Sequence, residues 1–221
     1  MDKSKIEFLR NTPLFRGCSG EEITELISKL DCKTKTYQKG EYILLAGNIV
    51  TDLCLVISGK VRIEFSDLWG NTTILGMTGM GGVFAESYAI SGKTPLMVNA
   101  LAEENTEILF ISASRLFELS GQGIGSATRS LTNMLKISAG MNIGLSQKIF
   151  HSSPKKIRER LMSFLSYQSE MHASNSFDIS MNREQMAEYL NLDRSALSKE
   201  LGKMKAEGLI DFRKNHFEIF I

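Results

Sequence analysis

Two apolar stripes separated by a short polar turn constrain the C-terminal part of this 221-residue chain most strongly. The apolar residues recur at helical spacing on either side of the turn: Met186, Ala187, Leu190, Leu197, Leu201 and Met204. Such spacing predicts two amphipathic helices. Residues 191–193 form the break, and Asp193 is placed to cap the second helix by accepting a backbone N–H. The segment is therefore expected to form a helix-turn-helix.

A hairpin is expected directly after the second helix. Glu207 and Gly208 end that helix, and apolar residues then alternate with polar ones around a turn at 214–215. The alternating apolar residues are Phe212, Phe217, Ile219 and Ile221. Together, the two helices and the hairpin predict a winged helix-turn-helix.

The second helix presents a polar face to solvent. Arg194, Ser195, Ser198 and Lys199 share this face near the helix N-terminus, the end that enters the major groove in many DNA-binding proteins. Arginine is well suited to the O6 and N7 atoms of guanine. The whole chain has a net charge of +1, and residues 151–221 hold nearly equal numbers of basic and acidic residues. A basic surface must therefore arise from the placement of charges.

The N-terminal half predicts a helix followed by many short strands. Ser19–Glu22 has the form of a capping box, and Gly40 introduces the strands. The apolar runs expected as strands are 42–45, 53–57, 61–65, 72–77, 96–102 and 108–111. Their separation by Gly, Asn, Asp or Ser is typical of an antiparallel barrel or roll, which can hold one small ligand.

Three N-terminal segments, together with the helix-turn-helix, resemble the CRP/FNR family of bacterial transcription regulators. The segments are KGEYIL at 39–44, LCLVISGKVRI at 53–63 and GVFAE at 82–86. The resemblance covers nearly the whole chain and implies an α+β fold. Its parts are an N-terminal antiparallel β-roll of the double-stranded β-helix or jelly-roll type, a long dimerisation helix and a C-terminal winged helix-turn-helix. We expect the effector-sensing domain at 1–125, the dimerisation helix at 126–150 and the DNA-binding domain at 151–221.

The effector site implied by the resemblance involves Glu86, Leu96 and Met97. Glu86 matches the residue that accepts hydrogen bonds from a ribose hydroxyl in cyclic-AMP-binding members, although Ala85 replaces their usual glycine. Their phosphate-binding Arg-Ser pair falls on Leu96 and Met97. A buried phosphate without a guanidinium would cost on the order of several kcal/mol. This argues against cyclic AMP, favours a structural role for Glu86, and leaves either an unidentified apolar effector or a roll that has lost its ligand.

The sequence also argues against metal cofactors. Cys18, Cys32 and Cys54 have no C-x-x-C spacing, and all three histidines lie in the C-terminal third. An iron–sulfur cluster, a zinc site and haem therefore lack a recognisable ligand set. Cys54 is expected to be a core residue, and oxidation sensing by Cys18 or Cys32 stays open. We expect no cofactor and no metal.

Residues 126–149 predict a long helix with a heptad seam. Steps of three and four residues connect Leu131, Met134, Ser138, Met141 and Leu145. One alternative is that this helix packs on its own roll, whereas the resemblance implies the central dimerisation helix. A homodimer also supplies the two half-site contacts that a selective DNA reader needs. Residues 151–154 are expected to be a hinge, because Pro154 disfavours helix before it, and the next helix is expected at 155–167.

The resemblance implies a sequence-specific transcription regulator that binds double-stranded DNA as a homodimer on a palindromic operator. Arg183 matches a phosphate-contacting position, Ser195, Ser198 and Lys199 match base-reading positions, and Arg194 aligns with a residue that reads a base in some members. Many members have glutamate in place of Ser195 and arginine in place of Lys199, so no known operator can be carried over. RNA polymerase is a further candidate partner, and activator or repressor stays open.

Two other classes of function fit parts of the sequence. One is a ligand-sensing module whose winged domain docks a protein partner, but the polar reading face favours DNA. The other is an enzyme, against which stand a glycine-rich turn at 79–82 without a P-loop lysine and histidines that we expect to lack partners. No run approaches the roughly 18 apolar residues of a membrane span, and the first ten residues lack a secretory core. We therefore expect a cytoplasmic protein without membrane contact.

Overall fold

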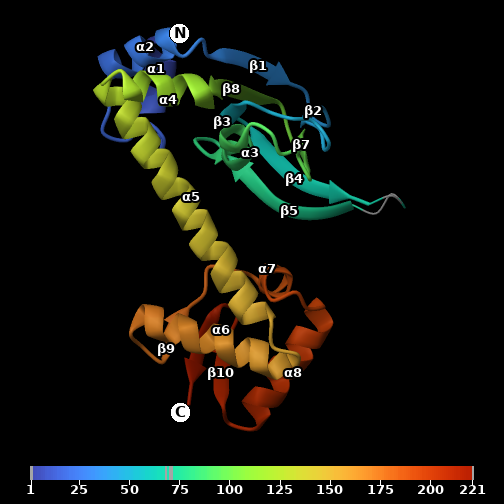
Figure 1. The fold of residues 1–221 in the computed structure, drawn as a ribbon. Helices are drawn as coiled ribbons and strands as arrows, with labels where there is room; N and C mark the ends of the chain where they lie inside the picture. The colour runs from blue at the N-terminus through green and yellow to red at the C-terminus, as the bar shows by residue number, and fades with distance from the viewer. Residues whose placement is uncertain (1, 68, 70–71, 221) are drawn as a thin grey trace. The chain divides into compact units, whose positions relative to one another are not determined.

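The computed structural model describes residues 2–67, 69 and 72–220. The chain divides into two compact units, Met1–Gly140 and Met141–Ile221, hereafter the first and the second unit (Figure 1). The long helix α5 (Gly125–Ser152) begins in the first unit and ends in the second, so the segment expected at 126–150 contributes to both. Ile221, the last residue of the expected hairpin alternation, lies outside the described residues.

The first unit combines an antiparallel β-roll with flanking helices, as the sequence predicts. Its helices other than α5 are α1 (Lys3–Arg10), α2 (Gly20–Lys29), α3 (Glu86–Ser91) and α4 (Ala113–Gly121). Its strands are β1 (Lys33–Tyr37), β2 (Tyr42–Leu44), β3 (Asp52–Ser58), β4 (Lys60–Ser66), β5 (Thr72–Gly79), β6 (Val83–Phe84), β7 (Asn99–Ala102) and β8 (Thr106–Ser112). Among the described residues they form two sheets, in the orders β1-β8-β3-β6 and β2-β7-β4-β5.

Alternation along the strands gives the roll two apolar layers. In β3, Cys54 and Val56 belong to a core that also contains Val61 of β4 and Ala102 of β7, the interior of the roll. Leu53, Leu55 and Ile57 face the other way, into the core built with the helices, because successive strand residues point to opposite faces of a sheet. Gly59 joins β3 to β4 with a φ of +84°, and a Cβ there would lie 2.5 Å from the carbonyl oxygen of Asn105.

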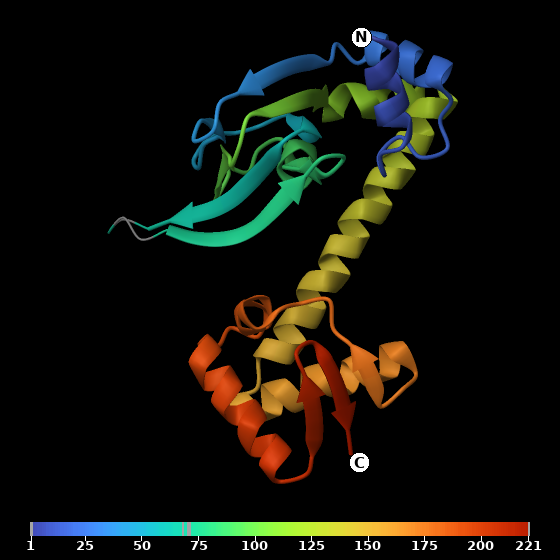
Figure 2. The same cartoon turned by 180° about the vertical axis from the view of Figure 1, so that it is seen from behind.

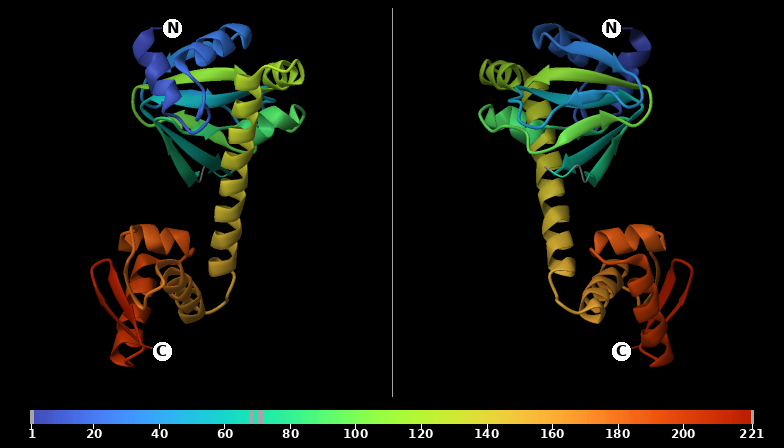
Figure 3. Two further views of the ribbon diagram at one scale, coloured as in Figure 1. Left: turned by 90° about the vertical axis from the view of Figure 1, so that its left-hand side faces the viewer. Right: turned by 90° about the vertical axis from the view of Figure 1, so that its right-hand side faces the viewer.

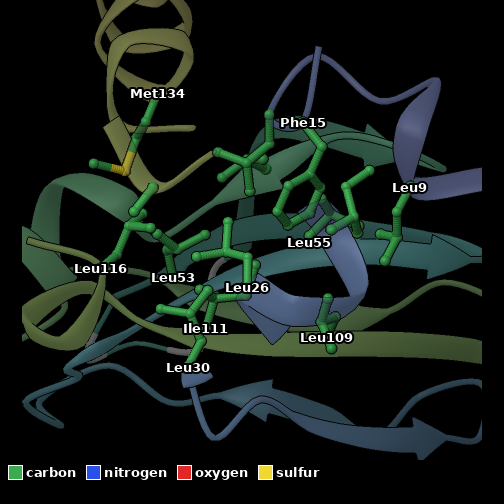
Figure 4. Close-up of a cluster of buried hydrophobic side chains, with 14 of the residues drawn as sticks. Leu9, Phe15, Leu26, Leu30, Leu53, Leu55, Leu109, Ile111, Leu116 and Met134 are labelled. Atoms are coloured by element: carbon green, nitrogen blue, oxygen red, sulfur yellow. The ribbon is translucent and has the colours of Figure 1, made fainter. Parts of the chain in front are cut away.

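The flanking helices bury their apolar faces on this outer layer (Figure 4). The expected capping box opens α2: the Ser19 hydroxyl accepts from the Glu22 N–H, and the Glu22 carboxylate accepts from the Ser19 N–H. Leu26 of α2 and Leu116 of α4 are 0% and 1% exposed. Met134 of α5 reaches the same cluster, as Figure 4 shows. The start of the long helix is therefore a structural part of the first unit.

The expected strand at 96–102 begins only at Asn99. Leu96 lies in the preceding loop, where its N–H donates to the Asn48 carbonyl and its own carbonyl accepts from the Gly47 N–H. Residues 99–102 pair with β4 over Glu64 to Val61, so the sheet partner sets where the strand starts. The apolar run alone does not reveal that limit.

The second unit is a winged helix-turn-helix (Figure 2). After the end of α5 come α6 (Ile157–His172), β9 (Ser176–Asp178), α7 (Arg183–Tyr189), α8 (Arg194–Ala206), β10 (Ile210–Arg213) and β11 (His216–Ile219). The hairpin of β10 and β11 forms the expected wing, and β9 adds to its β11 edge. Among the described residues, no helix combines the length and apolar character needed to cross a lipid bilayer.

Candidate nucleic-acid interface

The two helices of the expected helix-turn-helix, α7 and α8, are packed together through the apolar residues whose spacing predicts them. Met186 and Leu190 on the first helix and Leu197 and Leu201 on the second are all 0% exposed. A capping box of Asn182 and Gln185 opens α7. These contacts fix the buried side of α8, so the opposite side of the helix faces solvent.

The turn between the helices differs in one detail from the expectation. Asn191 adopts a left-handed conformation with a φ of 54°, which asparagine tolerates better than most residues. Asp193 occupies the N-cap position of α8, but its side chain accepts no capping hydrogen bond. The expectation that its carboxylate caps α8 is therefore wrong.

The reading face of α8 is free. Arg194, Ser195, Ser198 and Lys199 are all exposed, and within the described part of the chain none of these side chains forms a hydrogen bond or an ion pair. Four unengaged polar groups at a helix N-terminus have the chemistry needed to contact base edges and phosphates. The structure thus brings these four sequence-predicted residues onto one accessible surface.

Arg183 has a different environment from the residues of α8. Its guanidinium lies 5.0 Å from the ring centroid of Phe212 and 4.7 Å from that of Phe217, and it donates to the Lys214 carbonyl oxygen at 2.8 Å. Partial burial lowers the pKa of Arg183, although an arginine remains charged at any physiological pH. Arg183 therefore attaches the start of α7 to the wing, a role that sequence reasoning missed.

A groove of about 820 Å³ separates the start of α7 from the wing. Arg183 and Arg194 line it together with Arg213, Lys214 and His216 of the wing. Asp178 and Glu184 also border the groove, so its charge is mixed. Its cationic side joins the reading face of α8 to the wing turn, and this continuous surface suits an anionic, extended ligand.

The histidines are not without partners, contrary to the expectation. The His216 imidazole lies 3.1 Å from the Asp178 carboxylate and 3.2 Å from the Ser176 hydroxyl. This row resembles the order of groups in a serine hydrolase, but the Asp178 side chain is 83% exposed. A hydrated carboxylate does not supply the buried charge that stabilises an imidazolium during catalysis. The row instead ties β9 to β11.

His151 is also engaged, at the end of α5. It is 1% exposed, and its Nδ1 lies 2.9 Å from the Ser163 hydroxyl of α6. Its ring packs against Phe150, Phe164, Tyr167 and Tyr189. Residues 153–156 do separate α5 from α6, but the His151 side chain locks the end of α5 into the second unit.

The three residues expected at the effector site are not equivalent. Glu86 is 6% exposed, and the Ser87 hydroxyl donates to its carboxylate at 3.2 Å. Leu96 is 4% exposed, whereas Met97 is 68% exposed. Leu96 therefore contributes to packing and Met97 does not. Neither Leu96 nor Met97, the two residues expected at the phosphate-binding positions, has a hydrogen-bond donor in its side chain.

The three cysteines are shielded from solvent to different degrees. Cys18 and Cys54 are buried, and Cys54 belongs to the interior core of the roll as expected. Desolvation, reinforced by Asp52 and Asp31, raises the pKa of Cys32 to about 12. Because the thiolate is the reactive form, this environment gives Cys32 little reactivity toward oxidants at neutral pH.

The residues expected to form a seam on α5 have two different environments. Met134 is 3% exposed within the core of the first unit, and Leu131 packs against the same core. Met134 therefore cannot serve an intermolecular seam, and that expectation is wrong. Met141 and Leu145 are 43% and 62% exposed, and Ser138 is half-buried between the two groups.

Comparison with known proteins identifies both units. Residues 34–122 match the family model of the cyclic nucleotide-binding domain, and residues 159–221 match that of the Crp-like helix-turn-helix domain. The chain is 25% identical over 203 residues to the fumarate and nitrate reduction regulatory protein of Salmonella typhimurium, covering 90% of this chain and 78% of the relative. It is 32% identical over 101 residues to the cyclic AMP receptor protein of Thermus thermophilus. That match spans only 46% of this chain and 45% of the relative.

Solved structures show the same fold. CprK complexed with OCPA matches with a TM-score of 0.61 at 16% identity, covering 89% of this chain and 91% of that one. DNR from Pseudomonas aeruginosa matches with a TM-score of 0.51 at 18% identity, covering 100% of this chain and 96% of that one. The roll, the long helix and the winged domain therefore occur together in known proteins.

The burial of His151 predicts a pH-dependent stability of the second unit. Desolvation lowers the pKa of His151 below its ordinary value of 6.5, so the unfolded state binds a proton at a higher pH than the folded state does. The contribution of His151 to the free energy of unfolding is complete above pH 6.5 and is lost as the pH falls toward the pKa of the folded state. Thermal unfolding of the full chain at several pH values should show a smaller acid destabilisation for His151→Gln than for the wild type. The exposed His172→Gln is the control, and an unchanged pH slope in His151→Gln would contradict the prediction.

Proposed function

Because the chain belongs to the CRP/FNR family of transcription regulators, we propose that it acts as a homodimer that reads a palindromic DNA operator through α8. An unidentified effector other than cyclic AMP, sensed by the roll, controls this activity. The observation that carries the proposal is the free reading face of α8. Arg194, Ser195, Ser198 and Lys199 are exposed and unengaged, although the other side of the same helix is fully packed.

The charge distribution supports DNA as the ligand. The second unit is nearly neutral overall, but several of its carboxylates are paired internally: Glu200 and Glu207 with Arg158, and Asp211 with Lys205. Arg194 and Lys199 have no such ion pair among the described residues. Arg194 and Lys199 are thus uncompensated cations at the reading face, where they attract phosphates.

An exposed apolar seam on α5 supports the homodimer. Leu135, Asn142 and Ile149 follow each other at seven-residue spacing, and Ser138 and Leu145 fall between them. Leu135, Leu145 and Ile149 are 71%, 62% and 64% exposed. This pattern keeps Ser138 and Leu145 of the expected seam but has Leu135 and Asn142 in place of Met134 and Met141, because Met134 is buried in the core of the first unit. Steps of three and four residues are those of a two-stranded coiled coil, in which a polar residue such as Asn142 sets the register.

The connection between sensing and reading is α5 itself. Met134 belongs to the core of the first unit, and His151 belongs to the aromatic cluster of the second. Helix α5 is one continuous helix that begins in the first unit and ends in the second (Figure 3). A ligand that changes the packing of the roll against Met134 would act on the same helix that carries the proposed dimer seam. A shift in the pairing of two α5 helices would then alter the spacing of two reading faces.

The effector proposal predicts that cyclic nucleotides do not bind. Leu96 and Met97 supply no guanidinium or hydroxyl to a cyclic phosphate, so calorimetric titration of the full chain with cyclic AMP and cyclic GMP should show no binding at micromolar concentrations. A Leu96→Arg and Met97→Ser double variant tests the reason for this absence. Micromolar affinity of the wild type for either nucleotide would contradict the proposal.

The DNA-reading proposal predicts that the purified full chain selects a palindrome from random duplex DNA. The two half-sites should lie about one helical turn apart, as two reading faces of a symmetric dimer require. Against the selected duplex and a scrambled one, Lys199→Ala should reduce discrimination by about 10-fold. Arg183→Ala should weaken binding to both duplexes alike.

Lys29→Ala, on α2 of the first unit, is the control for these substitutions and should change neither affinity. Enrichment of no sequence would contradict an operator reader that is active without an effector. That outcome would favour a winged domain that docks a protein partner.

A further inference from the structure

Arg158 lies near the start of α6. All three nitrogens of its guanidinium donate hydrogen bonds to glutamates of α8 and its C-cap. Its Nε donates to Oε1 of Glu200 at 2.7 Å. Its Nη1 and Nη2 donate to the two carboxylate oxygens of Glu207, each at 2.7 Å. One arginine thus holds two carboxylates that lie seven residues apart, about two turns of helix. This clamp reaches from the middle of α8 to the residue that caps its C-terminal end.

The clamp lies away from the reading face. With roughly 100° of rotation per residue, Glu200 lies about 140° around the helix from Ser195 and about 120° from Arg194. The Glu200 side chain is only 15% exposed, and that of Arg158 is 35% exposed. Arg158 is therefore placed behind α8, where it contacts the helix without reaching the surface that faces DNA.

Apolar packing fixes which side of α8 is buried. Leu197, Leu201 and Met204 are buried beneath the helix, but hydrophobic contact is non-directional, so directional contacts add to how precisely the helix is oriented. Two charge-assisted hydrogen-bonding sites at separate points along the helix define both its rotation and its axial position. The planar fork of an arginine makes such bidentate contacts, whereas a lysine amine at the same place is a single point charge.

The ionisation of the partners agrees with this geometry. Hydrogen bonding to Arg158 lowers the pKa of Glu200, and the two glutamates raise the pKa of Arg158. Each shift favours the charged form of its group, so Glu200 and Arg158 stay paired as ions across the physiological range.

From this arrangement we infer that Arg158 is a positioning residue for sequence recognition. By fixing the rotation of α8 through Glu200 and Glu207, it directs Arg194 and Lys199 toward base edges. Sequence readout depends on directional hydrogen bonds to base edges, whereas contacts to phosphates carry no sequence information. Arg158 should therefore affect the choice of sequence more than the affinity for DNA in general. This role rests on the DNA-reading function proposed above.

The test compares the selected operator with a scrambled duplex for the wild type, Arg158→Lys and Arg158→Ala, well below the melting temperature of each protein. Both variants should lose about 10-fold in discrimination, while the affinity for the scrambled duplex and its salt dependence stay within about two-fold. Glu207→Gln should reproduce part of this loss. The double variant Arg158→Lys with Glu207→Gln should be no worse than Arg158→Lys alone, because the same contact is already gone.

Arg115→Lys is the matched control, since Arg115 also pairs with a glutamate but lies on α4 of the first unit. It should leave discrimination unchanged. Unchanged discrimination in Arg158→Lys would overturn the positioning role. Equal losses on both duplexes, with a shallower salt dependence, would overturn it too, because Arg158 would then be a phosphate contact. If the wild type itself prefers no sequence, the DNA-reading function fails and the role of Arg158 fails with it.

Discussion

The long helix α5 is packed into two separate cores, and the rest of the structure depends on that constraint. Met134 is buried with the leucines of the first unit, and His151 is buried among aromatic rings of the second. Between these two points the helix carries exposed apolar residues, among them Leu145 and Ile149. Burying a large apolar side chain stabilises by about 1.5–3 kcal/mol. These side chains stay exposed in a single chain. Burying them against a second copy would therefore stabilise a dimer substantially.

The second unit shows how a nearly neutral domain presents a cationic surface. Several of its carboxylates are paired with internal cations: Glu200 and Glu207 with Arg158, and Asp211 with Lys205. These ion pairs define how the elements are arranged, in addition to the apolar core that holds them together. The arginines act in the same directional way, since Arg183 joins α7 to the wing and Arg160 donates to the carbonyls of Leu190 and Asn191 in the turn. Net charge is therefore a poor guide to what this surface binds.

Local sequence patterns predicted the elements that bury one continuous apolar stripe. The helix-turn-helix, the wing hairpin and the capping box of α2 follow from spacing that needs no knowledge of distant residues. Strand β1 was missed because it is an edge strand of alternating lysine and threonine in which only Tyr37 is buried. Strands β6 and β9 are two and three residues long, too short to show a period, and they exist only because a neighbouring strand pairs with them.

The residues of the candidate site could also be predicted only where local spacing determines their environment. The exposed residues of α8 could be predicted, because the helix period assigns the packed side to Leu197, Leu201 and Met204 and leaves the reading-face residues outside it. The environments of Arg183, Arg158 and His151 could not, because their partners lie on elements far away in the sequence. The same holds for Met134, whose spacing fits a coiled-coil seam but whose side chain is buried in the core that the roll forms with the flanking helices.

The measurement that tests the central claim most directly is sedimentation equilibrium of the full chain and two single variants of α5. Leu145→Glu places a carboxylate within the seam, and Ile143→Glu places one on an equally exposed position of the same helix, roughly 160° away around its axis. The account predicts a dimer for the wild type and for Ile143→Glu, and a dissociation constant at least about 100-fold higher for Leu145→Glu, since opposed buried charges are strongly unfavourable. A monomeric wild type at micromolar concentration, or an equal effect of the two substitutions, would contradict it.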